Sequence, residues 1–124
     1  MTELIIHKIW KTGAIKDNYY LTTKKYYEDI KKDQFFRAWG GFGISLEILN
    51  YLKEHNIDTI IIRHIAKTGT YFYKSSPEDF LNFGKAREYN SDYYKVYNDW
   101  QYILNIKIFI KLSEDEGQKL WKMI

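Results

Sequence analysis

The sequence contains no cysteine and no long apolar run, and these two gaps in its composition rule out two classes of protein. Without cysteine among the 124 residues, neither a disulfide framework nor a thiolate metal site can form. No stretch reaches the roughly 18 consecutive apolar residues of a membrane-spanning helix, and no apolar run precedes a small-residue cleavage site. We therefore expect a soluble cytoplasmic protein with no membrane partner.

The signatures of common catalytic and cofactor sites are also missing. The glycine-rich stretch has neither Gly-x-Gly-x-x-Gly nor Gly-Lys-Ser/Thr spacing, so no nucleotide-binding fingerprint is met. His7, His55 and His64 stand in no metal-ligand spacing, and no strand supplies the Glu-x-Lys of restriction-type nucleases. The serines lack a nucleophile-elbow context. We predict no metal, no cofactor and no catalytic residue.

Charge and aromatic content are the most informative features of the composition. Nineteen Lys and Arg residues against 16 Asp and Glu residues give a formal net charge of +3, which is a mild excess. Aromatic residues make up 19% of the chain and include twelve tyrosines, whose rings suit cores, interfaces and stacking surfaces alike. The length fits a single domain, residues 1–124, with a core of its own.

The stretch 37–65 carries the clearest local pattern. It begins with three glycines in five residues, and glycine lets the backbone turn tightly and approach other groups closely. Ser45 follows where it can cap a helix, and the apolar residues after it recur at helical spacing. The β-branched run 59–62 then predicts a buried strand.

The predicted glycine loop has two interpretations. Free backbone N–H groups ahead of a helix N-terminus, with Arg37 nearby, suit an anion. The alternative, which we favour, is a tight turn that packs Trp39 and Phe42 against the sheet. The anion-binding residues of the first interpretation are Gly40, Gly41 and Gly43.

A similarity between two segments predicts an internal ββα duplication. Residues 61–69 and 5–13 are identical at six of nine positions and share the turn Lys-Thr-Gly. Each is followed by a second short strand and by a predicted short helix, over 22–32 in the first half and from Ser76 in the second. The alternative is chance similarity between two Ile-rich hairpins.

The C-terminal third is less regular. Residues 85–99 fit a partly ordered loop or a short helix, and 100–112 fit one long strand. Ser113 then opens a capping box for a C-terminal helix that docks back on the sheet. The predicted fold class is α+β: a mixed or antiparallel sheet of about five strands with one central helix and several short helices.

Basic residues alternate with aromatic ones at several places in the chain. Single-stranded nucleic acid is held by such pairs, because bases stack on rings while phosphates meet Lys or Arg. The alternative is a tyrosine-rich surface on a lysine-rich protein. The predicted nucleic-acid-binding residues are Lys24, Lys25, Arg37, Lys74, Arg87, Tyr89 and Tyr93.

Three functional hypotheses follow from these patterns. The leading one is a small non-enzymatic protein that binds nucleic acid. The second is a protein–protein or self-assembly module, a homo-oligomer built through exposed aromatic residues. The third is an enzyme with an anion subsite at the glycine loop, which requires Arg37, His55 or His64 to meet a carboxylate.

Overall fold

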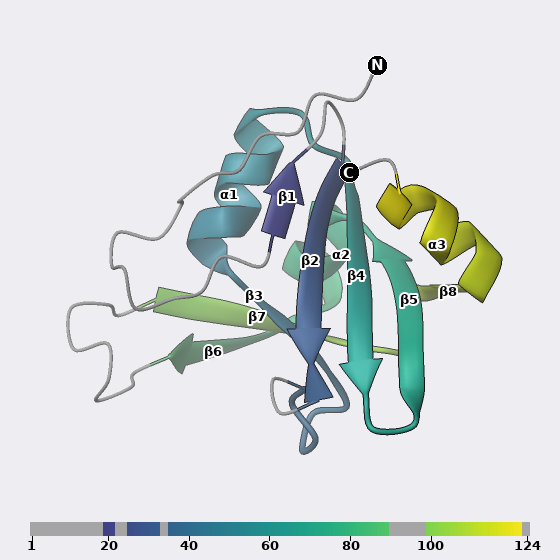
Figure 1. Ribbon diagram of the computed structural model, residues 1–124. Helices are drawn as coiled ribbons and strands as arrows, with labels where there is room; N and C mark the ends of the chain where they lie inside the picture. The colour runs from purple at the N-terminus through teal and green to yellow at the C-terminus, as the bar shows by residue number, and fades with distance from the viewer. Residues whose placement is uncertain (1–18, 22–24, 33–34, 90–98, 123–124) are drawn as a thin grey trace.

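The computed structural model describes residues 19–21, 25–32, 35–89 and 99–122. These residues form two β-sheets and three helices, so the predicted α+β class is confirmed while the single sheet of about five strands is wrong. The larger sheet has the strand order β1 (Tyr19–Leu21), β2 (Lys25–Lys31), β4 (Thr59–Ala66), β5 (Gly69–Ser75) and β8 (Ile110–Leu112) (Figure 1). The smaller sheet has the order β3 (Gly41–Ser45), β7 (Asp99–Asn105) and β6 (Lys85–Tyr89).

The larger sheet is mixed. Strands β2 and β4 are parallel, and the other neighbours in this sheet are antiparallel. A parallel pair needs a long connection, which here contains β3 and α1 (Leu46–Glu54). Strands β4 and β5 form the predicted hairpin, and Gly69, which begins β5 directly after the turn, has φ 150°, a conformation that favours glycine.

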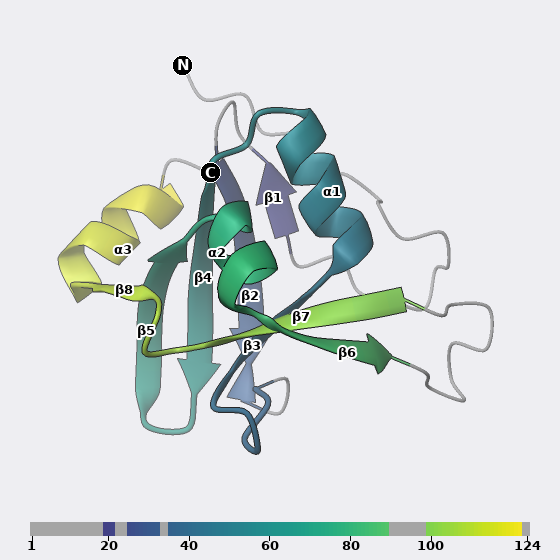
Figure 2. The same ribbon diagram turned by 180° about the vertical axis from the view of Figure 1, so that it is seen from behind.

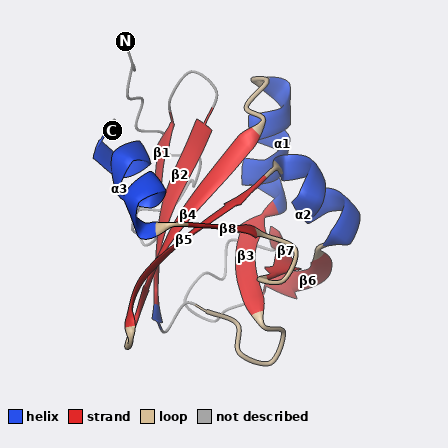
Figure 3. Cartoon of the chain, turned by 90° about the vertical axis from the view of Figure 1, so that its right-hand side faces the viewer, coloured by secondary structure: helices blue, strands red, loops and turns tan. Residues whose placement is uncertain are grey.

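The larger sheet is covered on both faces. Seen edge-on, it separates α3 (Glu114–Lys122) from the smaller sheet and from the helices α1 and α2 (Pro77–Phe83) (Figure 3). From behind, α1 and α2 lie beside β6 and β7 on the same side of the larger sheet (Figure 2). The two sheets and these two helices therefore enclose one space, which holds the hydrophobic core.

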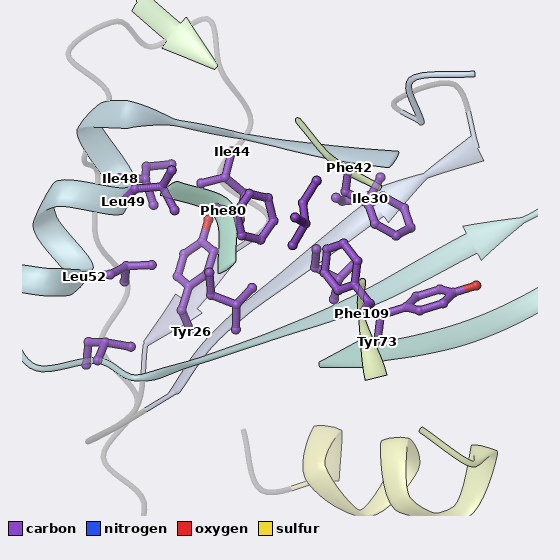
Figure 4. Packing of buried hydrophobic residues seen from close by; sticks show 14 residues of the cluster. Tyr26, Ile30, Phe42, Ile44, Ile48, Leu49, Leu52, Tyr73, Phe80 and Phe109 are labelled. Carbon is purple, nitrogen blue, oxygen red and sulfur yellow. The ribbon is translucent and has the colours of Figure 1, made fainter. Parts of the chain in front are cut away.

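The core consists of apolar side chains from both sheets and from α1 and α2 (Figure 4). Phe109, in the turn between β7 and β8, packs edge-on against Phe42 and Phe80, with ring centroids 5.5 and 5.7 Å apart. Such aromatic contacts add to the stabilisation from buried apolar area. Other core residues with at most 1% exposure are Tyr26, Ile44, Ile48, Leu49, Leu52, Ile60, Ile62 and Leu104.

The caps predicted for α1 and α2 are confirmed. The side chain of Ser45 accepts a hydrogen bond from the Ile48 N–H at 3.2 Å at the start of α1. Ser76 forms a complete capping box with Asp79, and Pro77 occupies the first turn of α2. These caps satisfy backbone N–H groups that have no partner inside the helix.

The short helix predicted over 22–32 is wrong, because residues 25–31 form strand β2. Tyr26 and Ile30 face the core, whereas Tyr27 lies on the opposite face, where its ring meets Trp121 of α3 edge-on at 5.3 Å between centroids. Both faces of β2 carry buried rings, so the apolar residues do not alternate with polar ones as in a half-exposed strand.

The predicted duplication finds no support in the described residues. The second half has α2 after its second strand, whereas in the first half β1 is followed by the strand β2. The other hairpin strand of the first half, 3–11, lies outside the described residues.

Two predictions for the C-terminal third also need correction. A loop or short helix was predicted over 85–99, but 85–89 form the edge strand β6 and Asp99 begins β7, while 90–98 lie outside the described residues. The long strand predicted over 100–112 is interrupted, and its two halves, β7 and β8, belong to different sheets. The Asn105 side chain stabilises the intervening turn by accepting a hydrogen bond from the Lys107 N–H at 2.9 Å. The C-terminal helix, α3, is present as predicted.

Candidate functional site

Basic side chains gather on the outer face of the smaller sheet. Phe42 and Leu104 are paired in the sheet and point into the core, so residues one position away point outward. Lys85 and Arg87 of β6 are such residues, and both are exposed.

The loop between β2 and β3 reaches the same face. The Lys85 ammonium lies 4.2 Å from the centroid of the Trp39 ring, which is a cation–π contact between residues far apart in sequence. Arg37, in the same loop, is exposed. We call the surface formed by Arg37, Trp39, Lys85 and Arg87 the basic face.

Hydrogen bonds fix the loop against β7. The Trp39 carbonyl accepts from the Asn105 side-chain amide at 3.2 Å, and the Gly40 carbonyl accepts from the Ile106 N–H at 2.9 Å. Gly40 has φ 62°, in the left-handed region that glycine adopts readily. The indole of Trp39 is therefore carried by an anchored turn.

Close packing explains why β3 carries glycines on this face. A Cβ on Gly41 would overlap the Leu104 carbonyl oxygen, and a Cβ on Gly43 would lie 2.8 Å from the Phe36 ring. Both glycines are strand residues, and the N-terminus of α1 lies beyond them at its cap, Ser45. In the structure, close packing accounts for Gly41 and Gly43, and left-handed backbone geometry for Gly40.

The cations of the basic face have no acidic partner within the described part of the chain. The ion pairs found there lie elsewhere: Lys53 with Glu78, and Arg63 with Asp29. Within the described ranges no ion pair offsets the charges of Arg37, Lys85 and Arg87, and such charges attract anions over a range of about 10 Å at moderate salt.

The structure separates the predicted binding residues into two groups. Arg37 and Arg87 belong to the basic face. Lys25 and Lys74 lie on the larger sheet, on the face covered by α3, because they share that face with Tyr27 and its strand neighbour Ile61. Tyr89 ends β6, two residues after Arg87, while Lys24 and Tyr93 lie outside the described residues.

The two histidines that the structure describes, His55 and His64, each contact aromatic rings. His55 ends α1, where its ring stacks on Tyr51 at 4.0 Å between centroids. His64 packs between Phe35 and Phe42, and burial lowers the pKa of its imidazole. No set of three or more histidine and acidic side chains in the described ranges is arranged to hold a metal ion.

A tyrosine–carboxylate pair on β2 was not predicted. The Tyr26 hydroxyl donates a short hydrogen bond to Glu28 Oε1. Burial is the largest cause that raises the pKa of Glu28 from 4.5 to about 7; the hydrogen bond lowers it and the charge of Asp29 raises it further. The pair follows from the strand conformation of β2, since residues two apart share a face of a strand.

Comparisons of the chain with protein-family models, with curated proteins and with solved structures gave no match. No helix in the described ranges is long and apolar enough to span a bilayer. The residues that sequence reasoning missed in the basic face are Lys85 and, as a functional residue, Trp39. Trp39 lies in the loop before β3 and Lys85 on β6, so only the tertiary fold brings these two together and no local signal in the sequence identifies them.

Proposed function

We propose that the protein binds single-stranded nucleic acid through the basic face and catalyses no reaction. The observation that carries this proposal is the contact of the Lys85 ammonium with the Trp39 ring, beside two further exposed cations, Arg37 in the loop of Trp39 and Arg87 on the strand of Lys85, with no acidic partner for the three in the described residues. Cations supply contacts to phosphates, and an aromatic ring supplies a surface on which bases stack.

Two features favour a single strand over a duplex. Duplex readers insert a helix or a two-stranded ribbon into the major groove, whereas the cations of the basic face stand on the edge strand β6 and on a short loop beside it. In addition, the bases of a duplex are stacked on one another and cannot reach Trp39, whereas those of a single strand can.

The test is a fluorescence-anisotropy titration of labelled single- and double-stranded oligonucleotides of one sequence at several salt concentrations. Three phosphate contacts predict that log K against log salt falls with a slope of about −2 for the single strand. We expect the single strand to bind more tightly than the duplex. No binding of either oligonucleotide at tens of micromolar protein and low salt would refute the proposal.

A further inference from the structure

Contacts with phosphates give a role to the cations of the basic face but none to the Trp39 ring. We propose, on the basis of the proposed function, that Trp39 is a stacking site for one unpaired base, and that Lys85 covers its ring in the free protein and moves to a phosphate when the base binds. The site thus takes one nucleotide by both its base and its phosphate.

The loop that carries the ring is held in place before any ligand binds. The backbone of Trp39 and Gly40 is tied to the end of β7 and to the residue after it by the hydrogen bonds from the Asn105 amide to the Trp39 carbonyl and from the Ile106 N–H to the Gly40 carbonyl. A base that stacks on Trp39 therefore does not need to order a loop first, and this saves part of the entropy cost of binding.

The Lys85 ammonium is easily displaced from the Trp39 ring. Lys85 is exposed and lies on an edge strand, and its ammonium group is carried on four flexible methylenes. A cation–π contact at an exposed site contributes less than the stacking of a nucleobase on an aromatic side chain. Exchange of the ammonium for a base is therefore favourable, and the released ammonium remains within reach of the phosphate of the same nucleotide.

The chain offers a matched control for Trp39. Trp100 is 47% exposed and belongs to β7 of the same sheet, but it shares a face with Leu104 and not with Ile103, the strand partner of Lys85. The Trp100→Ala variant therefore removes an exposed indole from the opposite side of the sheet.

The experiment compares a labelled deoxythymidine oligonucleotide with a backbone of equal length and charge that lacks bases. For the natural protein we expect the base-free backbone to bind roughly 5- to 150-fold more weakly, the range that corresponds to stacking of one base. Trp39→Ala should abolish this difference between the two probes, while Trp100→Ala should retain it. Circular dichroism of each variant checks that it is folded, and the comparison of the two probes on the natural protein needs no variant at all.

The outcomes separate the inference from the proposed function. Equal binding of the two probes to the natural protein would overturn the stacking site and leave salt-dependent nucleic-acid binding intact. A difference between the probes that persists in folded Trp39→Ala would also overturn it, because another residue would then hold the base. Binding of neither probe would refute the proposed function itself.

Discussion

Arg63 and Asp29 form a two-pronged ion pair between the neighbouring strands β4 and β2. The Nε–Oδ1 distance is 2.6 Å and the Nη2–Oδ2 distance is 2.8 Å. The Arg63 guanidinium also lies 4.5 Å from the centroid of the Trp121 ring. The two charged side chains are 29% and 16% exposed, so water screens them only in part. This pair therefore helps to hold α3 on the outer face of the larger sheet.

Asp29→Asn should lower the free energy of unfolding by about 1 to 3 kcal/mol, because it leaves the partly buried guanidinium without its anionic partner. Urea unfolding of the variant and the natural protein measures this difference. Asp58→Asn makes the same substitution at an exposed site beside Thr59, where we expect a change within about 0.5 kcal/mol. Equal effects of the two substitutions would show that the ion pair contributes nothing specific.

Gly117→Ala should destabilise the protein although alanine is the better helix former. A Cβ at Gly117 would overlap the ring of Phe72, so α3 would have to move off the sheet. Overpacking of this kind costs about 1 to 3 kcal/mol, against a gain of about 1 kcal/mol in helix propensity. The neighbouring Gln118 is exposed, and Gln118→Ala provides the control with almost no expected change. A higher thermal midpoint for Gly117→Ala than for the natural protein would contradict the packing of α3.

The raised pKa of Glu28 predicts that the stability of the protein falls as the pH rises through the weakly acidic range. Its pKa is raised from 4.5 to about 7 in the folded state, so the folded protein binds this proton more tightly than the unfolded chain. The contribution of Glu28 to the free energy of unfolding is therefore complete below about pH 4.5 and is lost as the pH rises to about 7. The full difference corresponds to at most roughly 3 kcal/mol.

Glu28→Gln removes this titration, because the amide remains neutral and its oxygen still accepts from the Tyr26 hydroxyl. We expect the variant to match the natural protein near pH 4.5 and to exceed it in stability near pH 8, by up to roughly 3 kcal/mol. Urea unfolding at a series of pH values gives the difference between the two proteins, in which the titration of all other groups cancels. A difference that does not change with pH would contradict the raised pKa.

The elements that were predicted correctly are those whose ends carry a helix cap or a tight turn. Ser45, Ser76 and the turn before Gly69 mark boundaries that the structure reproduces, because each satisfies a backbone requirement within a few residues. The strands β2 and β6 were missed for a different reason. Covered on both faces, β2 shows no alternation, and β6 is a short charged edge strand with no apolar period at all.

The candidate site was predictable only in part. Arg37 was identified from its place beside the glycine loop and Arg87 from its aromatic neighbour, and the structure places them in the loop and on the strand that the Trp39–Lys85 contact joins. Lys74 has the same local sequence pattern but lies on the other sheet, because only tertiary pairing decides which strand faces meet. For the same reason the contact between Lys85 and Trp39 has no signal in the sequence.

Removal of equal charge from two places on the molecule decides whether the nucleic acid binds at the basic face. Arg37→Gln with Arg87→Gln removes two cations from the basic face, and Lys67→Gln with Lys74→Gln removes two exposed cations from the larger sheet and its hairpin turn. For a single-stranded oligonucleotide, we predict that the first pair weakens binding about tenfold or more and makes the salt slope shallower by about 1.4, while the second changes the affinity less than about twofold. Equal losses of affinity in the two double variants would contradict binding at the basic face.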